Sequence, residues 1–243
     1  MDPLALAFAA IATLYAAVGQ AGASGYIAVM ALAGFTPLAM KTTALALNLV
    51  VAGIGSVLFL RAGRVAWRSL WPFVLAGIPF SLLGGAIHLP EGVYFPLVGT
   101  VLVLSAIQMA RSALRPGTAP PDATVPPPLL PALLTGAGIG LLSGTTGTGG
   151  GVFLAPVILA MRWGTPRQTA ATTALFNLVN SAAALLGARA AWDHLPDALP
   201  LWCLAVAAGG LLGALVGSRF LSDRWLRGLL AALLLVAGVR LIL

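Results

Sequence analysis

The sequence predicts an all-α polytopic membrane protein built from two homologous four-segment halves, and three observations lead to this prediction. Of the 243 residues, 60% are hydrophobic and only 8% are charged, whereas about a quarter of the residues of a soluble domain are charged. The mean hydropathy is +1.01, and apolar runs recur at about the 20-residue length that crosses a bilayer. The second half of the chain also repeats motifs of the first.

Eight apolar segments divide evenly between the two halves. They lie near residues 3–34, 42–60, 70–88, 92–110, 130–161, 168–188, 199–218 and 225–243. Between the fourth and the fifth, the stretch RPGTAPPDATVPPPLLP holds seven prolines among 17 residues, a composition typical of a semi-rigid linker. We therefore predict a first transmembrane repeat over 1–111, a proline-rich linker over 112–129 and a second transmembrane repeat over 130–243.

An internal duplication relates the two halves. GQAGASGY in the first half aligns with GTTGTGGG in the second, and FTPLAMKTTALALNLV aligns with GTPRQTAATTALFNLV. Within these motifs Pro37 meets Pro166, and Asn48 meets Asn177, at the same offset of 129 residues. Because duplication is a common way to build a transporter, this pattern favours a transport protein.

The basic residues indicate how the segments cross the membrane. If all eight segments cross, the basic residues divide seven against six, and neither side is enriched. If segments 1 and 5 dip in and return to the same side, ten basic residues share one side and three share the other, which is the bias expected of cytoplasmic loops. The ten are Arg61, Arg64, Arg68, Arg111, Arg115, Arg162, Arg167, Arg219, Arg224 and Arg227; the three are Lys41, Arg189 and Arg240.

The lengths of segments 1 and 5 favour the same arrangement. Each runs to about 32 residues, which suits two half-helices joined at a glycine-rich tip better than one span. We therefore expect inverted repeats with segments 1 and 5 re-entrant, both termini outside and the linker 112–129 in the cytoplasm. The alternative is that each of the two segments is a broken single span.

The glycine-rich stretch SGTTGTGGG (143–151) is the most unusual part of the chain. Irregular backbone at membrane depth is tolerated only where it is buried in protein or lines a cavity. A helix that starts there directs unpaired N–H groups and a partial positive charge into the cavity, which suits an anion. Three alternatives are a phosphate-binding loop, whose lysine is missing, a hinge without ligand, and close helix packing through small residues. Packing explains Gly209, Gly213 and Gly217.

Polar residues within apolar segments usually face the protein interior, and those near the two tips are the candidates for substrate binding. Thr42, Thr43, Asn180 and Ser181 are further candidates to line the cavity, and hydrogen bonds between helices are the alternative role for each of these polar residues. Lys41, Arg167 and Gln168 lie near segment ends, where an interfacial position is expected. The predicted substrate-binding residues are Gln20, Gly22, Ser24, Gly25, Asn48, Thr145, Thr146, Gly147, Thr148, Gly149, Gly150, Gly151, Thr172, Thr173 and Asn177.

Other kinds of chemistry have no clear residues in this sequence. We expect no cofactor, no metal and no enzymatic activity, because no metal-ligand motif is present and no acid lies deep in a segment. The two histidines, His88 and His194, lie near loops and far apart in the sequence. The net charge of +7 is better explained by arginine-rich loops than by a nucleic-acid partner. The single Cys203 excludes an intramolecular disulfide.

The chain resembles the sulfite exporter TauE/SafE family over nearly its whole length. The resemblance rests on the duplication, on GTGGGVFLAPVIL followed by GTPRQTAATTALFNLVNS, and on the proline-rich linker; the first copy reads GASGY in place of a run of glycines. It implies a multi-pass permease of the prokaryotic cytoplasmic (inner) membrane for small sulfur-containing anions such as sulfite, sulfoacetate or related organosulfonates.

We therefore expect a secondary transporter that moves a small anion across the lipid bilayer by alternating access. A channel is the alternative within transport, and a membrane scaffold that uses its glycines only for helix packing is the alternative outside it. A membrane-embedded enzyme comes third, because no catalytic group can be named. The sequence leaves open the direction of transport, the coupling ion (proton or sodium) and the oligomeric state.

Overall fold

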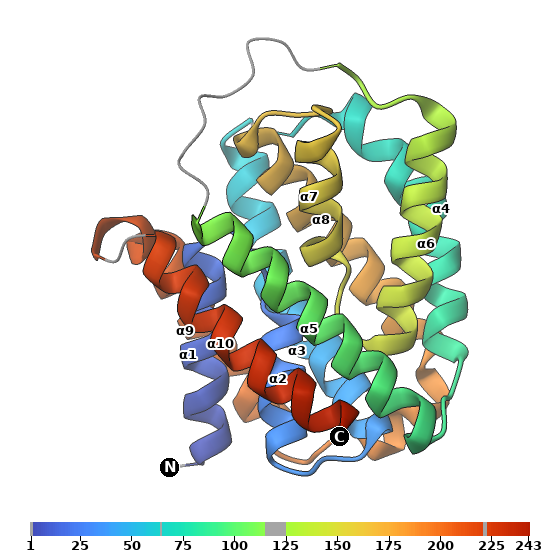
Figure 1. The fold of residues 1–243 in the computed structure, drawn as a ribbon, viewed down its shortest axis with the longest axis vertical. Helices are drawn as coiled ribbons and strands as arrows, with labels where there is room; N and C mark the ends of the chain where they lie inside the picture. Colours follow the sequence, from blue (N-terminus) through green and yellow to red (C-terminus); the bar gives the residue numbers. More distant parts are fainter. Residues whose placement is uncertain (1, 64, 115–124, 221–222) are drawn as a thin grey trace.

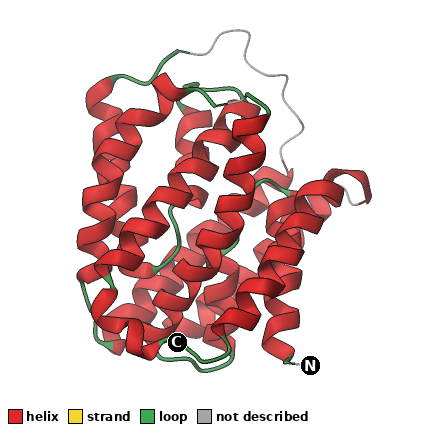
Figure 2. Cartoon of the chain, turned by 180° about the vertical axis from the view of Figure 1, so that it is seen from behind, coloured by secondary structure: helices red, strands yellow, loops and turns green. Residues whose placement is uncertain are grey.

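Helices make up all the regular structure in the parts of the chain that the structure describes (Figures 1 and 2). The computed structural model describes residues 2–63, 65–114, 125–220 and 223–243. The elements are α1 (Pro3–Ala17), α2 (Ala23–Leu32), α3 (Pro37–Arg61), α4 (Trp67–Ala86), α5 (Glu91–Leu114), α6 (Leu129–Thr146), α7 (Gly151–Ala160), α8 (Pro166–Gly187), the 3-10 helix η1 (Arg189–His194), α9 (Leu199–Phe220) and α10 (Asp223–Ile242). The predicted all-α class is confirmed.

Local sequence explains where several helices begin. Pro3, Pro37 and Pro166 each occupy the first turn of a helix, where proline's fixed φ suits the helix and its missing N–H costs nothing. Thr165 and Gln168 form a capping box at the start of α8: the Gln168 N–H donates to Thr165 Oγ1 at 3.3 Å, and the Thr165 N–H donates to Gln168 Oε1 at 3.0 Å. Gln168 is therefore engaged at the helix end.

The predicted breaks in segments 1 and 5 are confirmed. Segment 1 forms α1 and α2, and the residues between these helices include Gly19 and Gly22, whose φ angles are +79° and +97°. Segment 5 forms α6 and α7, and Gly147, Gly149 and Gly150 between them have φ angles of +77° to +85°. Only glycine adopts such angles without strain, so these glycines end one helix and allow the next to begin.

The chain termini mark one end of the molecule. Both termini lie at the lower end in Figure 1, together with the connection from α2 to α3. The start of α6 and the end of α7 lie at the opposite, upper end. Each broken helix pair therefore returns toward the end of the molecule from which it starts.

Six of the described helices are long and apolar enough to cross a membrane: α3, α4, α5, α6, α8 and the 225–242 part of α10. The other apolar helices are shorter, including α1, α2, α7 and the 199–215 part of α9. The chain is thus a multi-pass membrane protein by helix length and composition. Residues 115–124 of the predicted linker, with Arg115, lie outside the described residues, as does Arg64.

Three helix pairs pack with their backbones close together: α4 with α6, α1 with α9, and α5 with α10. In the first pair, a Cβ added to Gly140 would lie 2.5 Å from the carbonyl oxygen of Gly77, so only glycine fits. Cβ atoms on Gly209 and Gly213 of α9 would likewise overlap carbonyl oxygens of α1. The predicted packing role of these two glycines is confirmed; the surroundings of Gly217 lie outside the described part of the chain.

Candidate functional site

In each of the short helices α2 and α7, the first N–H group is capped by an asparagine side chain from the longer helix that follows. The Ala23 N–H at the start of α2 donates to Asn48 Oδ1 of α3 at 3.2 Å. The Gly151 N–H at the start of α7 donates to Asn177 Oδ1 of α8 at 2.7 Å. The first N–H groups of a helix lack partners within it and carry its partial positive charge. The two halves of the chain thus satisfy this need in the same way.

The two asparagines converge on the glycine-rich loop 147–150. A Cβ on Gly149 would overlap Asn48 Nδ2 and would lie 3.0 Å from Asn177 Oδ1. Asn48 Nδ2 also donates to Ser181 Oγ of α8 at 2.8 Å, which ties the first half of the chain to the second. Asn48 and Ser181 are fully buried, and Asn177 is 6% exposed. The absence of a side chain at Gly149 therefore lets the two amides approach each other.

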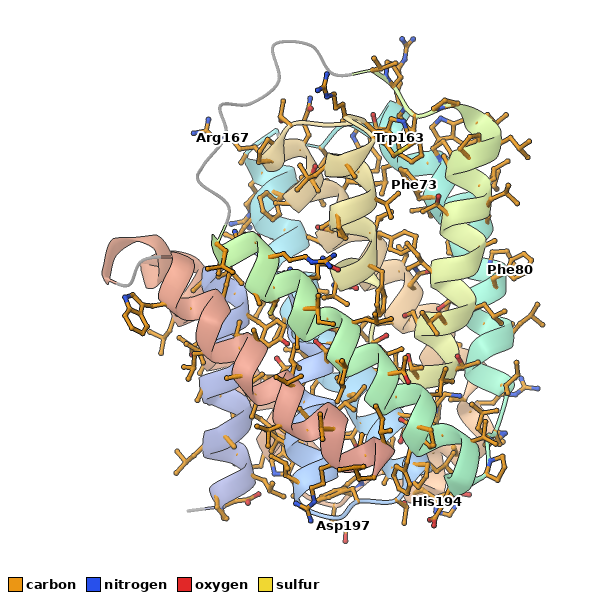
Figure 3. All side chains as sticks on the ribbon, in the orientation of Figure 1. Phe73, Phe80, Trp163, Arg167, His194 and Asp197 are labelled. Carbon is orange, nitrogen blue, oxygen red and sulfur yellow. The ribbon has the colours of Figure 1, made fainter. Side chains whose placement is uncertain are left out.

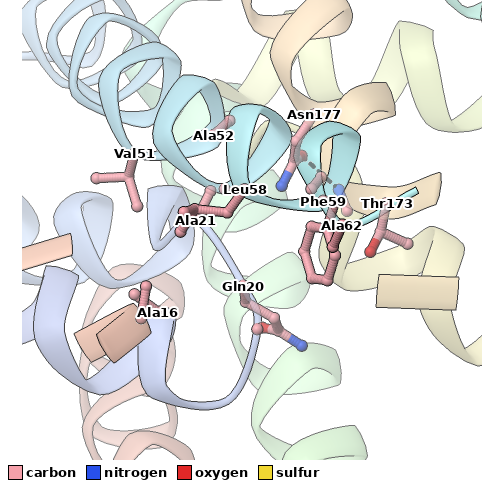
Figure 4. Close-up of a pocket in the computed structure, with 15 residues that line it drawn as sticks. Ala16, Gln20, Ala21, Val51, Ala52, Leu58, Phe59, Ala62, Thr173 and Asn177 are labelled. Atoms are coloured by element: carbon pink, nitrogen blue, oxygen red, sulfur yellow. Dashed lines mark hydrogen bonds between the residues drawn. The ribbon is translucent and has the colours of Figure 1, made fainter. Parts of the chain in front are cut away.

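A cavity of about 290 Å³ adjoins this centre, and we call it the asparagine cavity (Figure 4). Its polar lining comes from Asn177, Thr173, the backbone of Gly151 and Gln20. The Oε1 atom of Gln20 is buried and has no hydrogen-bond partner. The remaining lining is apolar and comes mainly from the second half of α3, including Phe59. Polar groups from α8, from the start of α7 and from the connection between α1 and α2 thus line the cavity together with apolar side chains of α3.

The rest of the glycine-rich loop is held by its own hydroxyl groups. Thr146 Oγ1 donates to the Leu142 carbonyl at 2.7 Å and lies 2.9 Å from Thr148 Oγ1. Gly147 ends α6, and Gly150 precedes the first residue of α7. These predicted residues shape the tip around Gly149, whereas Asn177, Thr173 and Gln20 face the cavity.

Four predicted residues lie away from the asparagine pair. Ser24 Oγ is 2.8 Å from the hydroxyl of Tyr15, and Gly25 packs against that tyrosine and Ile11. Thr172 lies beside Phe73 and Trp163 in a small separate gap; these two rings lie toward the upper end in Figure 3. Thr145 donates to carbonyls of its own helix and lines a second cavity. Gly22, the last of the predicted residues to be placed, directly precedes α2.

The chain's three tyrosines contribute to the tips and were not among the predicted residues. Tyr15 contacts Ser24 as described, the Tyr26 hydroxyl donates to the Ala21 carbonyl at 3.1 Å, and the Tyr94 hydroxyl donates to the Thr146 carbonyl at 3.0 Å. All three are at most 2% exposed. A buried tyrosine usually has a partner for its hydroxyl, so tyrosines within apolar segments were the signal that could have found them.

Lys41 is buried and not interfacial, so the sequence-based expectation for it was wrong. Its side chain is 3% exposed, and Nζ donates to the carbonyls of Gly84, Gly85 and Ile87 at 3.0, 2.7 and 2.8 Å. These carbonyls end α4, where the helix carries partial negative charge. The partners lie more than 40 residues away, so no local pattern shows the contact. Arg167, in contrast, is exposed at the upper end in Figure 3.

The described residues contain no group of three or more histidine, cysteine, aspartate or glutamate side chains that could hold a metal ion. The candidate site instead offers amides, hydroxyls and backbone N–H groups, which are suited to binding and not to covalent chemistry. Asparagine amides and helix N-termini can hold an anion without carrying a full charge.

Six apolar helices long enough to cross a bilayer, and two broken helices that meet at a buried polar centre, define a polytopic membrane protein of the transporter type. The chain belongs to the sulfite exporter TauE/SafE family, whose family model matches residues 4–241. It is 62% identical over 239 residues to "Probable membrane transporter protein y4hK" of Sinorhizobium fredii (strain NBRC 101917 / NGR234), covering 98% of this chain and 97% of that protein. No solved structure matches the chain. Family and relative indicate a membrane transporter and not an enzyme.

Proposed function

We propose that the protein is a secondary transporter that moves a small anion, a sulfur oxyanion or an organosulfonate such as sulfite or sulfoacetate, by alternating access. The observation that carries this proposal is the paired capping of α2 and α7 by Asn48 and Asn177, on either side of Gly149 and beside the asparagine cavity. The amide oxygens of the two asparagines accept hydrogen bonds from helix N–H groups to which substrate oxygens would bind. On rotation of the amides, their NH₂ groups would donate to the same substrate.

The contacts between helices support an inverted repeat as the basis of alternating access. By the sequence duplication, α6 corresponds to α1 and α9 corresponds to α4. The close pairs α4–α6 and α1–α9 are then equivalent contacts, each made between a first helix of one half and a later helix of the other. The pairs α3–α8 and α5–α10 join corresponding helices. Such reciprocal packing lets one repeat move against the other around a central site.

The charges support an orientation with the linker end in the cytoplasm of a prokaryotic cell and both termini outside. Arg61 ends α3, Arg68 lies in the first turn of α4, and Arg162 and Arg167 lie between α7 and α8 or at the start of α8. The end of α3, the start of α4, the end of α7 and the start of α8 lie at the upper end of Figure 1. Since Lys41 is buried, it does not count against the cytoplasmic enrichment of arginine.

Substitution of Asn177 by aspartate tests the proposal. Asn177→Asp keeps an oxygen to accept the Gly151 N–H and adds a charge that suits a helix N-terminus, so the fold is expected to persist. A negative charge at the site repels an anion, and we expect sulfite flux into proteoliposomes to fall about tenfold or more, which corresponds to about 1.4 kcal/mol. Flux at the wild-type rate would refute the assigned site.

Two adjacent threonines of α8 provide the matched controls. Thr173 lines the asparagine cavity and Thr172 does not, although both are at most 6% exposed. Thr173→Val should slow sulfite flux, whereas Thr172→Val should leave it near the wild-type rate. A folded wild-type protein that moves no sulfite or sulfoacetate and co-purifies with a partner protein would favour the scaffold alternative.

A further inference from the structure

The lining of the asparagine cavity is electrically neutral. Among its 15 residues, all of which belong to the described part of the chain, none carries an ionisable side chain. Arg61 directly precedes the lining residue Ala62, but the arginine is exposed and does not line the cavity. The buried Lys41 donates to carbonyls at the end of α4 instead. An anion in this cavity would therefore meet dipoles and no counter-ion.

The hydrogen-bond donors of the lining amount to less than one full positive charge. The Asn177 side chain is 6% exposed, and its Oδ1 accepts the Gly151 N–H (Figure 4). Its Nδ2 has no hydrogen-bond partner among the described residues, so this amide nitrogen can donate to a ligand. The start of α7, at Gly151, adds the partial positive charge of a helix N-terminus, which is about half an elementary charge. These groups can compensate much of one negative charge, but not two.

Two side-chain oxygens of the lining are available only as acceptors. Thr173 Oγ1 donates its one hydrogen to carbonyls of its own helix, those of Thr169 and Ala170, at 2.9 and 3.1 Å. Gln20 Oε1 is buried and has no hydrogen-bond partner. A buried acceptor without a donor is costly, so these oxygens favour an O–H or N–H group of the ligand over a second anionic oxygen. The lining thus suits an oxyanion whose remaining part is neutral.

We propose that the asparagine cavity selects singly charged oxyanions, namely hydrogensulfite and sulfonates whose remaining part is neutral, over doubly charged ones. This inference rests on the proposed function, because alternating access encloses the anion at a central site. The cost of removing an ion from water rises with the square of its charge, so two charges on one group cost about four times as much as one. The proposed substrates are thereby narrowed: sulfite is carried as hydrogensulfite, and sulfoacetate, with its ionised carboxylate, is disfavoured.

Sulfoacetate and its carboxamide, sulfoacetamide, are the matched probes for this proposal. The two molecules have nearly the same shape, but at neutral pH sulfoacetate carries two negative charges and sulfoacetamide carries one. Titration calorimetry of the full-length, detergent-solubilised protein should give sulfoacetamide a dissociation constant at least about tenfold lower than that of sulfoacetate. Equal affinities, or tighter binding of sulfoacetate, would overturn the proposal.

A lysine at position 20 should relax this selectivity. Gln20 is partly exposed, so the ammonium group of Gln20→Lys can stay hydrated and the fold is expected to persist. A positive charge about 5 Å from the second anionic group strengthens binding of the dianion relative to the monoanion roughly fourfold in water. The ratio of the two dissociation constants should fall by at least that factor, and an unchanged ratio would overturn the proposal. Gln20→Met, similar in size and uncharged, is the matched control and should keep the preference for sulfoacetamide.

Sulfite flux into proteoliposomes separates this inference from the proposed function. If flux depends on Asn177 but the two probes bind equally, or neither binds, the charge selectivity is wrong and the central site stands. If sulfoacetamide binds preferentially but Asn177→Asp transports at the wild-type rate, the cavity selects by charge and its assignment to transport is wrong. If the folded wild type moves no sulfite and binds neither probe, both proposals are overturned.

Discussion

Gly149 is the position at which a single methyl group tests the centre of the molecule. Its φ of +77° costs an alanine about 1–2 kcal/mol. The added Cβ would also overlap Asn48 Nδ2, so that asparagine must move. Asn48 makes two hydrogen bonds, to Ala23 and Ser181, and each contributes about 0.5–1.5 kcal/mol. Gly149→Ala is therefore expected to destabilise the protein by about 2–5 kcal/mol.

Gly34 provides a matched control for the backbone contribution. Its φ is +78°, and a Cβ there would meet nothing within 4 Å, so Gly34→Ala measures the conformational cost alone. The free energy of unfolding in mixed detergent–SDS micelles should fall about 1–3 kcal/mol further for Gly149→Ala than for Gly34→Ala. Equal destabilisation by the two substitutions would refute the described position of Asn48 against Gly149.

Three further predictions concern packing, a buried cation and pH. Gly140→Ala should destabilise by about 1–3 kcal/mol by forcing α6 away from α4, whereas Gly138→Ala, with open space around it, should be neutral or stabilising in the same unfolding assay. Lys41→Met removes the donor to three carbonyls at the end of α4 and should cost about 2–4 kcal/mol; an unfolding free energy within about 0.5 kcal/mol of wild type would contradict this role. The hydrogen bond from Trp202 to Asp2, at 2.5 Å, holds the pKa of Asp2 below its ordinary value. Because its pKa is lowered in the folded state, ionised Asp2 stabilises the folded protein at pH values above the ordinary carboxyl pKa of about 3.9. This stabilisation is lost as the pH falls through the lowered pKa. The stability difference between wild type and Trp202→Phe should thus shrink in acid, and a difference that grows below about pH 4 would contradict the assignment.

Local sequence was sufficient to predict the helix breaks and the equivalence of the asparagines. Runs of glycine disfavour a helix interior, and their position in two unusually long apolar segments predicted both breaks. The common offset of Asn48 and Asn177 predicted matching positions. It did not show that their oxygens cap α2 and α7, because a capping contact over about 25 residues depends on how the helices pack.

Contacts between distant parts of the chain could not be read from the sequence. Lys41 stands near the start of an apolar segment, where lysines usually reach the membrane surface, and only the position of the α4 end explains its burial. His88 and His194 belong to different halves and line the same cavity, to which the start of α3, the connection between α4 and α5, and η1 contribute. Tyr94 reaches the glycine-rich tip in the same way, from a helix of the other half.

The reciprocal packing of α1 on α9 and of α6 on α4 has a consequence for biosynthesis. α1 is inserted first, but its main partner is made near the end of translation, so the first tip has no complete surroundings until almost the whole chain has left the ribosome. We therefore expect each half to need the other in order to fold. Halves expressed together from two genes should assemble, and either half expressed alone should be removed by membrane proteases.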